Sequence, residues 1–205
     1  MPAAPPQLTR RTILRTAIDL LDRDGYAAFS LPRLGDELGI RTPSLYHHFR
    51  DRAELLAEIA RAVVRETPIP VRRPDAEWTE YFVELSVNFR RTILRHPNTA
   101  PVLLQFLPRD VLTSLYEESA VLLAETTDIP TSAHVLILDG LERFVLGNAL
   151  IESTAPRAAD GNPFPSVDPE QQPRLAAAIA ANSLDAEERF VASVRAFLMG
   201  VAALP

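Results

Sequence analysis

The stretch GIRTPSLYHHFRDRAELL, residues 39–56, contains two helix starts that lie unusually close together. Thr42 followed by Pro43 is typical of a helix start, with threonine as the cap and proline at the first helical position. Asp51 is a second capping residue shortly afterwards. The helix between the two caps therefore has room for only one or two turns, and it carries a tyrosine and two histidines.

The residues that precede this short helix complete a helix-turn-helix pattern. Ser30 is expected to cap a helix over residues 31–38, and Gly39 is expected to end that helix and free the backbone for a short turn. Positions four apart in a helix lie on the same face, so the apolar residues of both helices share one side. The residues expected to pack together are Ile18, Leu34, Leu38, Leu45 and Phe49.

The opposite side of the short helix is polar, and its hydroxyl and imidazole groups suit phosphate oxygens and base edges in a DNA major groove. Tyr46 could instead fill the core, but the apolar residues already define the inward side. Arg41 is also consistent with a solvated surface charge. The pair His47–His48 does not predict a metal site, because adjacent helical residues diverge and no third ligand is near in sequence. The expected DNA-binding residues are Ser30, Arg33, Arg41, Thr42, Pro43, Ser44, Tyr46, His47, His48 and Arg52.

The composition narrows the possible classes of protein. The chain has 205 residues, of which 47% are hydrophobic, enough for a sizeable core in one or two domains. It has no cysteine, which excludes disulfides and cysteine metal sites and is consistent with a cytoplasmic location. No apolar run approaches the roughly 20 residues that span a bilayer, so no membrane contact is expected. No nucleophile elbow or glycine-rich phosphate loop is present, so neither catalysis nor a cofactor is expected.

The net charge of −6 is unusual for a nucleic-acid-binding protein, but it is unevenly distributed. Residues 1–65 contain 10 arginines and 8 acidic residues, a net charge of +2, whereas residues 66–205 contain 11 arginines and 19 acidic residues, a net charge of −8. A polyanion would be attracted to the first part and repelled by the second. Random scatter of charge is the alternative explanation.

The remaining sequence predicts helices almost throughout, and therefore an all-α fold. Three prolines interrupt this pattern within residues 66–77, so we place there the boundary between a helix-turn-helix DNA-binding domain, residues 1–65, and a larger ligand-binding and dimerisation domain, residues 75–205. Residues 155–173, with five prolines, predict a long loop. The expected helices are 8–24, 31–38, 43–48, 51–65, 78–95, 111–126, 131–153, 174–181 and 185–203, with a short one inside 96–110.

The segment 131–153 is apolar on more than one face, so it must be covered on all sides. Pairing of this helix and the last helix, 185–203, with their copies in a four-helix bundle would cover it. A homodimer through these two helices is therefore expected.

The N-terminal part resembles the TetR-type bacterial transcriptional repressors over residues 9–65. The similarity rests on the pattern G-x-x-x-(P/small)-(S/T)-L-Y-x-H-F-x-x-(K/R)-x-x-L-(L), matched here by Gly39, Pro43, Ser44, Leu45, Tyr46, His48, Phe49, Arg52, Leu55 and Leu56. The resemblance implies phosphate contacts for Tyr46, His48 and Arg52. It implies base contacts for Arg41, Thr42, Pro43, Ser44 and His47. Gly35 departs from the alanine that is usual in the family.

The larger domain resembles, more distantly, the ligand domain of the tetracycline-repressor type. Its drug- and magnesium-binding positions are apolar here, as at Leu85, Leu103 and Ile151, so neither tetracycline nor a metal is expected. The resemblance implies a cavity for a small hydrophobic or aromatic molecule. Each aromatic candidate is also consistent with core filling, His96 with a helix end, and Arg143 with an ion pair to Asp139 at a dimer interface. The candidate lining residues are Trp78, Phe82, Leu85, Phe89, His96, Leu103, Phe106, Tyr116, Arg143, Phe144 and Gly147.

Together these features predict a homodimeric repressor that a small molecule releases from a palindromic operator in double-stranded DNA. One alternative is a ligand-independent activator or architectural protein, which would have a solid core in place of the cavity. Another is an α-helical enzyme or ligand-binding scaffold that does not bind DNA.

Overall fold

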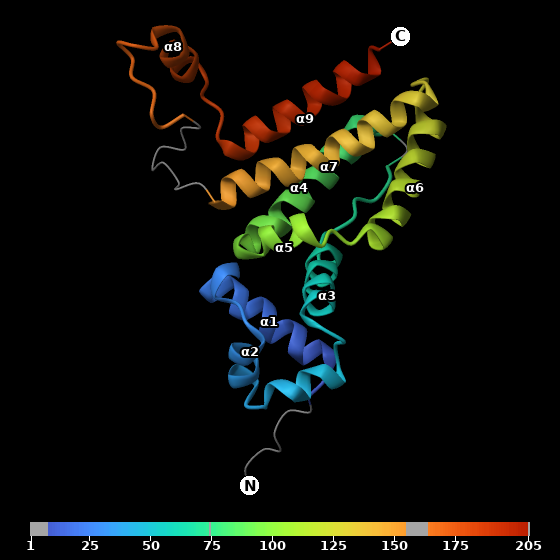
Figure 1. The fold of residues 1–205 in the computed structure, drawn as a ribbon. Helices are drawn as coiled ribbons and strands as arrows, with labels where there is room; N and C mark the ends of the chain where they lie inside the picture. Colours follow the sequence, from blue (N-terminus) through green and yellow to red (C-terminus); the bar gives the residue numbers. More distant parts are fainter. Residues whose placement is uncertain (1–7, 74, 155–163, 205) are drawn as a thin grey trace.

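The computed structural model of the chain describes residues 8–73, 75–154 and 164–204. Within these ranges the regular structure is helical and contains no β-strand, which confirms the predicted all-α fold (Figure 1). The α-helices are α1 (Arg10–Asp24), α2 (Leu31–Leu38), α3 (Arg52–Arg65), α4 (Trp78–Arg95), α5 (Ala100–Gln105), α6 (Arg109–Thr126), α7 (Thr131–Thr154), α8 (Pro173–Ala181) and α9 (Ala186–Ala202). Short 3-10 helices are η1 (Tyr26–Ala28), η2 (Thr42–His47) and η3 (Pro97–Thr99).

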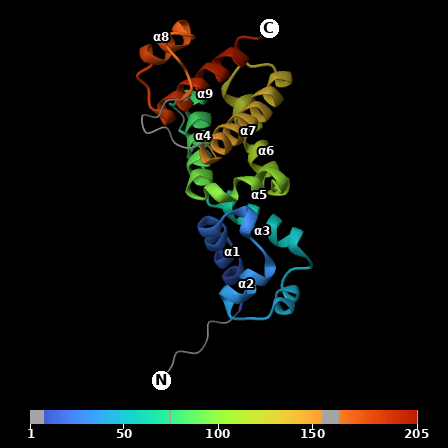
Figure 2. The ribbon, with the colours of Figure 1, turned by 60° about the vertical axis from the view of Figure 1, so that its left-hand side comes forward.

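The chain folds into a small N-terminal domain, α1 to α3, below a larger helical domain, α4 to α9 (Figures 1 and 2). Capping side chains begin the helices of the small domain. Thr9, Ser30 and Asp51 each accept a hydrogen bond from the backbone N–H three residues later, at the N-termini of α1, α2 and α3. The predicted caps Ser30 and Asp51 are therefore confirmed.

The short helix of the helix-turn-helix differs from its predicted form. It is the 3-10 helix η2, and Arg41, not Thr42, is its N-cap. No side chain caps it. The expectation that Thr42 would be the cap was therefore wrong: Thr42 is already the first helical residue, directly before Pro43. A 3-10 helix is the form that such short helical segments commonly take, because each hydrogen bond spans fewer residues.

The turn before η2 depends on two glycines. Gly39 has a φ of 66°, in the left-handed region that glycine adopts at little cost, and its N–H donates to the carbonyls at the end of α2. At Gly35 a Cβ atom would lie 3.0 Å from the carbonyl oxygen of Ile40, so α2 and the chain that leads into η2 approach closely. This close approach gives a physical reason for the glycine that replaces the family's alanine.

The core of the small domain contains the apolar residues that the pattern placed there. Leu45 and Phe49 are buried, as are Ile18 and Leu34, and Leu38 is partly buried against the same cluster. The inward side of η2 is therefore confirmed.

In the larger domain α4, α7 and α9 pack on one another around a buried arginine. The Arg90 side chain on α4 is 4% exposed, forms an ion pair with Glu152 on α7, and donates to Asn148 on α7 at 2.8 Å. It also lies 3.4 Å from Glu187 on α9 and 5.3 Å from the ring centroid of Phe190. A buried charge needs such partners, so Arg90 fixes the three helices relative to one another.

Helices α7 and α9 approach closely at Gly140. A Cβ atom there would lie 2.2 Å from the ring of Phe197, so a larger residue at this position would displace that ring. Phe144 packs beside Phe190 in the same interface, with ring centroids 5.7 Å apart. These contacts cover one side of α7 within the chain.

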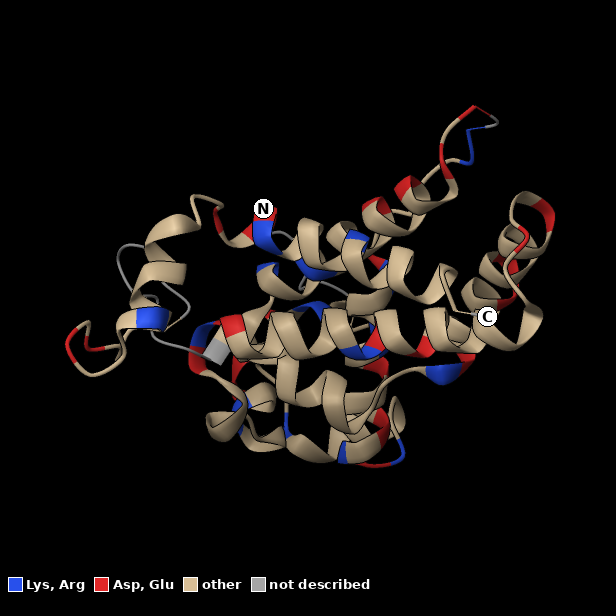
Figure 3. Cartoon of the chain, turned by 90° about the horizontal axis from the view of Figure 1, so that it is seen from above, with Lys and Arg blue, Asp and Glu red and all other residues tan. Residues whose placement is uncertain are grey.

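Another part of the α7 and α9 surface is apolar and exposed. Val135, Leu136 and Met199 are exposed large hydrophobic residues on these two helices. Figure 3 shows long uncharged stretches on the helices seen from above, and from Val191 to Ala202 the only charged residue is Arg195.

The predicted loop over 155–173 lies partly outside the described residues. Its described portion, residues 164–172, contains hydrogen-bonded turns and no helix. The helix α8 follows and lies apart from the α4, α7 and α9 layer (Figure 1). Among the described helices, none is long and apolar enough to cross a membrane.

Candidate functional site: helix-turn-helix surface and ligand cavity

The outward side of η2 forms a polar surface. Tyr46 is 52% exposed, so its ring does not fill the core. Arg41, Pro43 and His47 are exposed, and the predicted partners Thr42, Ser44 and His48 are half-buried at the edges of the same helix. The phenol, imidazole and hydroxyl groups of this polar surface are of the kinds that bind phosphate oxygens and base edges.

Arg10 anchors η2 to α1, a role that no sequence pattern had indicated. Its guanidinium donates to the carbonyl of His48 at 2.8 Å, pairs with Glu54 at 3.1 Å, and lies 4.5 Å from the ring centroid of Phe49. Arg10 therefore holds the end of the short helix against the first turns of α1 and α3.

The other predicted DNA-binding residues lie at different places on the small domain. Ser30 caps α2 and accepts the Arg33 N–H at 3.4 Å. The Arg33 guanidinium is exposed but pairs with Asp24 at 2.5 Å. Arg52 is exposed, and its guanidinium lies over the rings of Tyr26 and Phe29, 5.6 and 5.9 Å from their centroids. No hydrogen bond from Arg52 is found within the described ranges, so its N–H groups are available to a phosphate.

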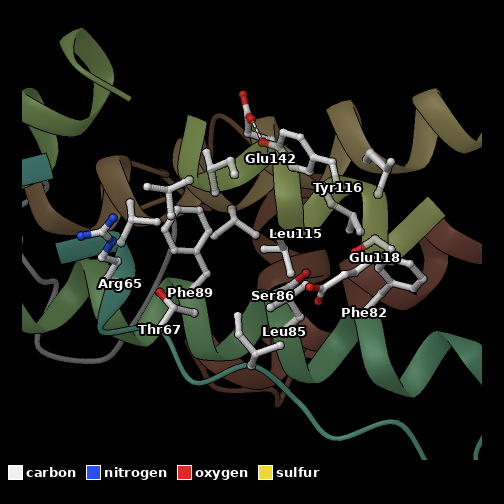
Figure 4. A pocket seen from close by; sticks show the side chains of 18 residues that line it. Arg65, Thr67, Phe82, Leu85, Ser86, Phe89, Leu115, Tyr116, Glu118 and Glu142 are labelled. Carbon is white, nitrogen blue, oxygen red and sulfur yellow. Dashed lines mark hydrogen bonds between the residues drawn. The ribbon is translucent and has the colours of Figure 1, made fainter. Parts of the chain in front are cut away.

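A cavity of about 300 Å³ lies in the larger domain, between the end of α3, the linker after it, and helices α4, α6 and α7 (Figure 4). Its walls are mainly apolar, as is usual for small-molecule sites. The apolar lining residues are Val64, Ile69, Phe82, Leu85, Phe89, Val111, Leu112, Leu115, Leu138, Leu141 and Val145. The polar ones are Arg65, Thr67, Ser86, Tyr116, Glu118, Ser119 and Glu142.

Four of the predicted ligand-binding residues line this cavity: Phe82, Leu85, Phe89 and Tyr116. The other seven lie elsewhere. Leu103 is buried in the core and Phe106 packs against it, while Phe144 packs on α9. Trp78 packs edge-on against Phe82, 5.9 Å between centroids, and lines a separate hollow beside the linker. Gly147 and His96 are not among the lining residues.

Arg143 also lies outside the cavity. Its side chain is 75% exposed and pairs with Asp139 one turn earlier at 2.7 Å. The ion pair that the sequence suggested is therefore present on the surface of α7, and among the described residues of this domain the buried arginine is Arg90.

One wall of the cavity contains a polar chain of three side chains. The Tyr116 hydroxyl donates to Glu142 Oε2, and Arg109 donates to the same oxygen at 2.6 Å. The Glu142 side chain is only 8% exposed. Burial, together with the adjacent Glu142 carboxylate, raises the pKa of Tyr116 well above its ordinary value of 10.0, so the phenol stays protonated and remains a donor.

The facing wall carries two hydroxyl groups. Ser86 lines the cavity and is 4% exposed. Thr67 Oγ1 is buried and has no hydrogen-bond partner within the described part of the chain. Figure 4 shows Thr67 and Ser86 across the cavity from Tyr116 and Glu142. A buried hydroxyl without a partner is costly, and a bound molecule would satisfy it. Sequence patterns did not identify Ser86, Thr67 or Glu142, because each looks like an ordinary helix or linker residue.

The two domains meet through polar contacts around α3 and the end of α4. Arg61 on α3 pairs with Asp110 at the start of α6. The Tyr26 hydroxyl donates to Gln105 at 3.0 Å, and Asn98 donates to the Asp22 carbonyl at 3.0 Å. The last residues of α3, Val64 and Arg65, line the cavity, so one helix extends from the helix-turn-helix to the ligand site.

His96 lies at the centre of this interface. Its Nδ1 is 2.6 Å from Asp22 on α1, and its Nε2 is 3.2 Å from Glu66 just after α3. Burial alone would lower the pKa of His96, but the hydrogen bonds to Asp22 and Glu66 outweigh it and raise that pKa above 6.5. Within the ranges that the structure describes, no group of three or more His, Asp or Glu side chains is placed to hold a metal ion.

Comparison with known families agrees with this architecture. The sequence model described as bacterial regulatory proteins, tetR family, matches residues 13–59. The model described as tetracyclin repressor-like, C-terminal domain, matches residues 69–204, most of the chain. The chain belongs to the TetR family. The N-terminal TetR match contains the helix-turn-helix, and the C-terminal match contains most of the cavity lining, with Val64, Arg65 and Thr67 lying between the two matches.

Individual TetR relatives are similar to different extents. The tetracycline repressor protein class A from transposon 1721 of Escherichia coli is 31% identical over 97 residues, which cover 47% of this chain and 45% of that protein. The chain thus spans less than half of the length of this relative. Apo ActR, a TetR-family protein from Streptomyces coelicolor, superposes with a TM-score of 0.77 at 28% identity, covering 98% of this chain and 96% of ActR. ActR in complex with actinorhodin superposes with a TM-score of 0.75 at 27% identity, covering 96% and 97%.

Proposed function

We propose that the chain is a ligand-responsive transcriptional repressor, which leaves a palindromic DNA operator when a small hydrophobic or aromatic molecule enters the cavity. The observation that carries this proposal is the course of α3. The helix begins beside the helix-turn-helix and ends in the cavity wall with Val64 and Arg65. A ligand in the cavity therefore contacts the C-terminal end of α3, and the N-terminal end of the same helix positions the helix-turn-helix.

The DNA-binding part of the proposal rests on the exposed side of η2. Tyr46, His48 and Arg52 contact phosphates. The residues that read base edges are Arg41, Thr42, Pro43, Ser44 and His47. The Arg33–Asp24 ion pair gives Arg33 a supporting role at the edge of this surface. The two recognition helices of a dimer contact half-sites about 34–36 Å apart, one turn of DNA.

The dimer forms through α7 and α9, helices 131–153 and 185–203 of the sequence prediction. The exposed Val135, Leu136 and Met199 on these helices support this arrangement, because large apolar side chains on one surface favour association. The DNA-binding domain is residues 1–65 and the ligand-binding and dimerisation domain is residues 75–205. The protein acts in the cytoplasm, where bacterial DNA is accessible to it, and as a regulator it has no catalytic role and no cofactor.

The switch operates through the spacing of the two DNA-binding domains. A ligand shifts a protein between two conformations only if it binds one of them better. A molecule that pushes on Val64 and Arg65 favours a position of α3 that differs from the one required by the operator. The two helix-turn-helix domains of the dimer then no longer fit successive major grooves.

The ligand is a largely apolar molecule. The cavity lining supports this, and so does the similarity to ActR, which has been crystallised with actinorhodin. The alternative, a ligand-independent activator or architectural protein, is less well supported because the cavity of about 300 Å³ leaves space where such a protein would have a solid core.

A gel-shift assay tests the proposal. The purified chain is titrated against the DNA that flanks its own gene at several salt concentrations. Tight, salt-dependent binding to a short palindrome supports the specific repressor. Weak binding that is independent of sequence would favour the architectural alternative, and no binding to any DNA would favour a scaffold without DNA-binding activity.

A double variant tests the phosphate contacts. Tyr46→Phe combined with Arg52→Ala should weaken binding to all sequences and make the salt dependence shallower, since log K depends on the number of neutralised phosphates, with about one unit of slope lost per charge removed. Arg143→Gln, which removes an exposed arginine in the other domain, is the matched control and should leave the slope unchanged. An unchanged slope in the double variant would contradict the assignment.

A further inference from the structure

The short helix η2 cannot hold its own position. It has six residues, Thr42–His47, and no side chain caps its start. Isolated helices of this length are unstable in water, so contacts with other elements must fix it. We infer that Arg10 and Glu54 form a clamp that holds the end of η2 in the orientation needed to read base edges. This inference rests on the proposed function, because it concerns the DNA surface of the same regulator.

The clamp contacts a backbone carbonyl at the end of η2. His48 is the C-cap residue, and the Arg10 guanidinium on α1 donates to its carbonyl oxygen at 2.8 Å. Carbonyls at the end of a helix lack partners within that helix, so this donor fixes the backbone there. The same guanidinium lies 4.5 Å from the ring centroid of Phe49, which is buried in the core of the small domain. Arg10 therefore has two contacts on the segment that ends η2.

Glu54 on α3 holds the guanidinium of Arg10. Its Oε1 pairs with Arg10 at 3.1 Å, and its Oε2 accepts the backbone N–H of Arg50 at 2.7 Å. The N–H of Glu54 itself donates to Asp51, the cap of α3, at 2.8 Å. The Arg50 N–H, and after it the Arg10 guanidinium, lower the pKa of Glu54, so this carboxylate is charged at neutral pH. An isolated surface ion pair would fix little, but this carboxylate joins α1, α3 and the segment that leaves η2.

Charge and position give Glu54 different effects on DNA binding. Figures 1 and 2 show η2, drawn in light blue, at the end of the small domain that points away from the larger domain, and Glu54 lies in the first turn of the helix that follows. A carboxylate near DNA repels phosphates, so by charge alone its removal tightens binding to every sequence equally. Loss of the clamp weakens only the base contacts, which carry the sequence information. The ratio of operator affinity to affinity for unrelated DNA therefore separates the two effects.

The test uses two replacements of Glu54 that have the same charge. Glu54→Gln keeps an oxygen that can accept a hydrogen bond, whereas Glu54→Met keeps only the length of the side chain. Fluorescence anisotropy measures the affinity of each full-length variant for two duplexes, one selected from a random pool by the wild-type chain and one with the same bases scrambled. The ratio of the two affinities should fall about tenfold in Glu54→Met, as for roughly one mismatched base pair, and less than about threefold in Glu54→Gln.

Further variants separate positioning from a direct phosphate contact by Arg10. Arg10→Lys keeps the positive charge but replaces the planar guanidinium with a single ammonium, so the ratio should fall while the salt slope stays unchanged. If Arg10 only contacted a phosphate, this variant would keep the ratio of the wild type. Glu37 is the matched control, because it also pairs with an arginine of α1, Arg23, at 2.9 Å. Glu37→Gln and Glu37→Met should have equal ratios.

Amide hydrogen exchange without DNA gives a second readout. The N–H groups of Ser44, His48 and Phe49 donate to carbonyls within η2 or directly before it. These amides should exchange faster in Glu54→Met than in Glu54→Gln, while the amides of α1 and α3 keep their protection and show that the variant is folded. If Glu54→Met does not fold, the ratio in Arg10→Lys decides the matter.

Equal ratios in the two Glu54 variants would overturn the inference. A wild-type ratio in Arg10→Lys, or exchange at η2 that does not differ between the Glu54 variants, would do the same. Each of these outcomes leaves the proposed function intact, because the wild-type chain still binds its selected duplex. If the wild-type chain selects no duplex from the pool, the proposed function fails and the inference fails with it.

Discussion

Replacement of His96 by glutamine should destabilise the protein in acid more than in alkali. The imidazole is 18% exposed and bridges two carboxylates on different parts of the small domain, Asp22 and Glu66. Arg95 is the other charged group nearby, 3.9 Å from Glu66. A protonated imidazole donates to both carboxylates, whereas a neutral imidazole donates to only one. Glutamine can donate hydrogen bonds but carries no charge.

The size of the effect follows from the two contacts. A hydrogen bond to a charged group contributes about 1.5–3 kcal/mol, and the 2.6 Å contact to Asp22 belongs in that range. The 3.2 Å contact to the more exposed Glu66 contributes less than ~1 kcal/mol, as surface ion pairs do. The expected loss is therefore about 2–3 kcal/mol when His96 is charged. For a chain of this length each kcal/mol lowers Tm by roughly 2–4 °C, so we expect a decrease of about 5–10 °C.

The pH dependence has a definite sign. The folded pKa of His96 is raised above the ordinary value of 6.5, so the folded state binds the proton more tightly than the unfolded state. The stabilisation is then fully present below pH 6.5 and is lost as the pH rises through the folded pKa. Wild type and His96→Gln should differ most below pH 6.5 and converge above the folded pKa.

The assay is thermal unfolding of both proteins from pH 5.5 to 9, with Asp22→Asn as a second single variant and the double variant to complete the cycle. The coupling between the two residues should decline over the same pH range. A difference in Tm that stays constant from pH 5.5 to 9, or a coupling below about 0.5 kcal/mol at low pH, would refute the charged bridge.

Three further substitutions test other parts of the structure. Arg90→Met should cost about 3 kcal/mol in chemical unfolding, because it leaves the partly buried Glu152 carboxylate without its arginine partner, whereas Arg91→Met, at an exposed neighbouring position, should cost less than ~1 kcal/mol. Gly140→Ala should displace the Phe197 ring and lower Tm by at least several degrees, about 1–3 kcal/mol of overpacking, and an unchanged Tm would contradict the α7–α9 contact. His47→Ala should change which operator base is preferred at one position in a binding-site selection, without reducing the salt slope.

Local sequence signals were sufficient for most of the helices. A capping side chain forms its hydrogen bond within three residues, so Ser30 and Asp51 could be identified from the sequence alone. The form of η2 was harder to predict, because Thr42 and Arg41 are both plausible first residues and the choice depends on how closely the turn packs on Gly35. The exposed side of η2 followed from the positions of Leu45 and Phe49.

The cavity and the buried charges depend on contacts between distant segments, which explains why the sequence predicted them only partly. Arg90 and Arg143 both lie in helices with apolar neighbours, but only Arg90 faces α9, where its partner Glu187 is 97 positions away. In the sequence Glu142 looks like an ordinary residue of α7. Its hydrogen bond to Tyr116 on α6, 26 positions away in the sequence, could not be predicted from local patterns. Aromatic residues were better guides, since Phe82 and Phe89 do line the cavity.

The interface around α3 bears on how strongly a ligand can act on DNA binding. The helix has 14 residues, about 21 Å at 1.5 Å per residue, and it moves as one piece when its interior hydrogen bonds are intact. To change a population from 1:99 to 99:1, a ligand needs a differential affinity of about 5.5 kcal/mol between the two positions of that helix. The ion pair from Arg61 to Asp110 and the bridge through His96 tie the small domain to α6 and α4. These ties make the position of the small domain follow that of the cavity walls. Weakening them should therefore reduce the effect of ligand on operator affinity while leaving the affinity of the cavity for its ligand nearly unchanged.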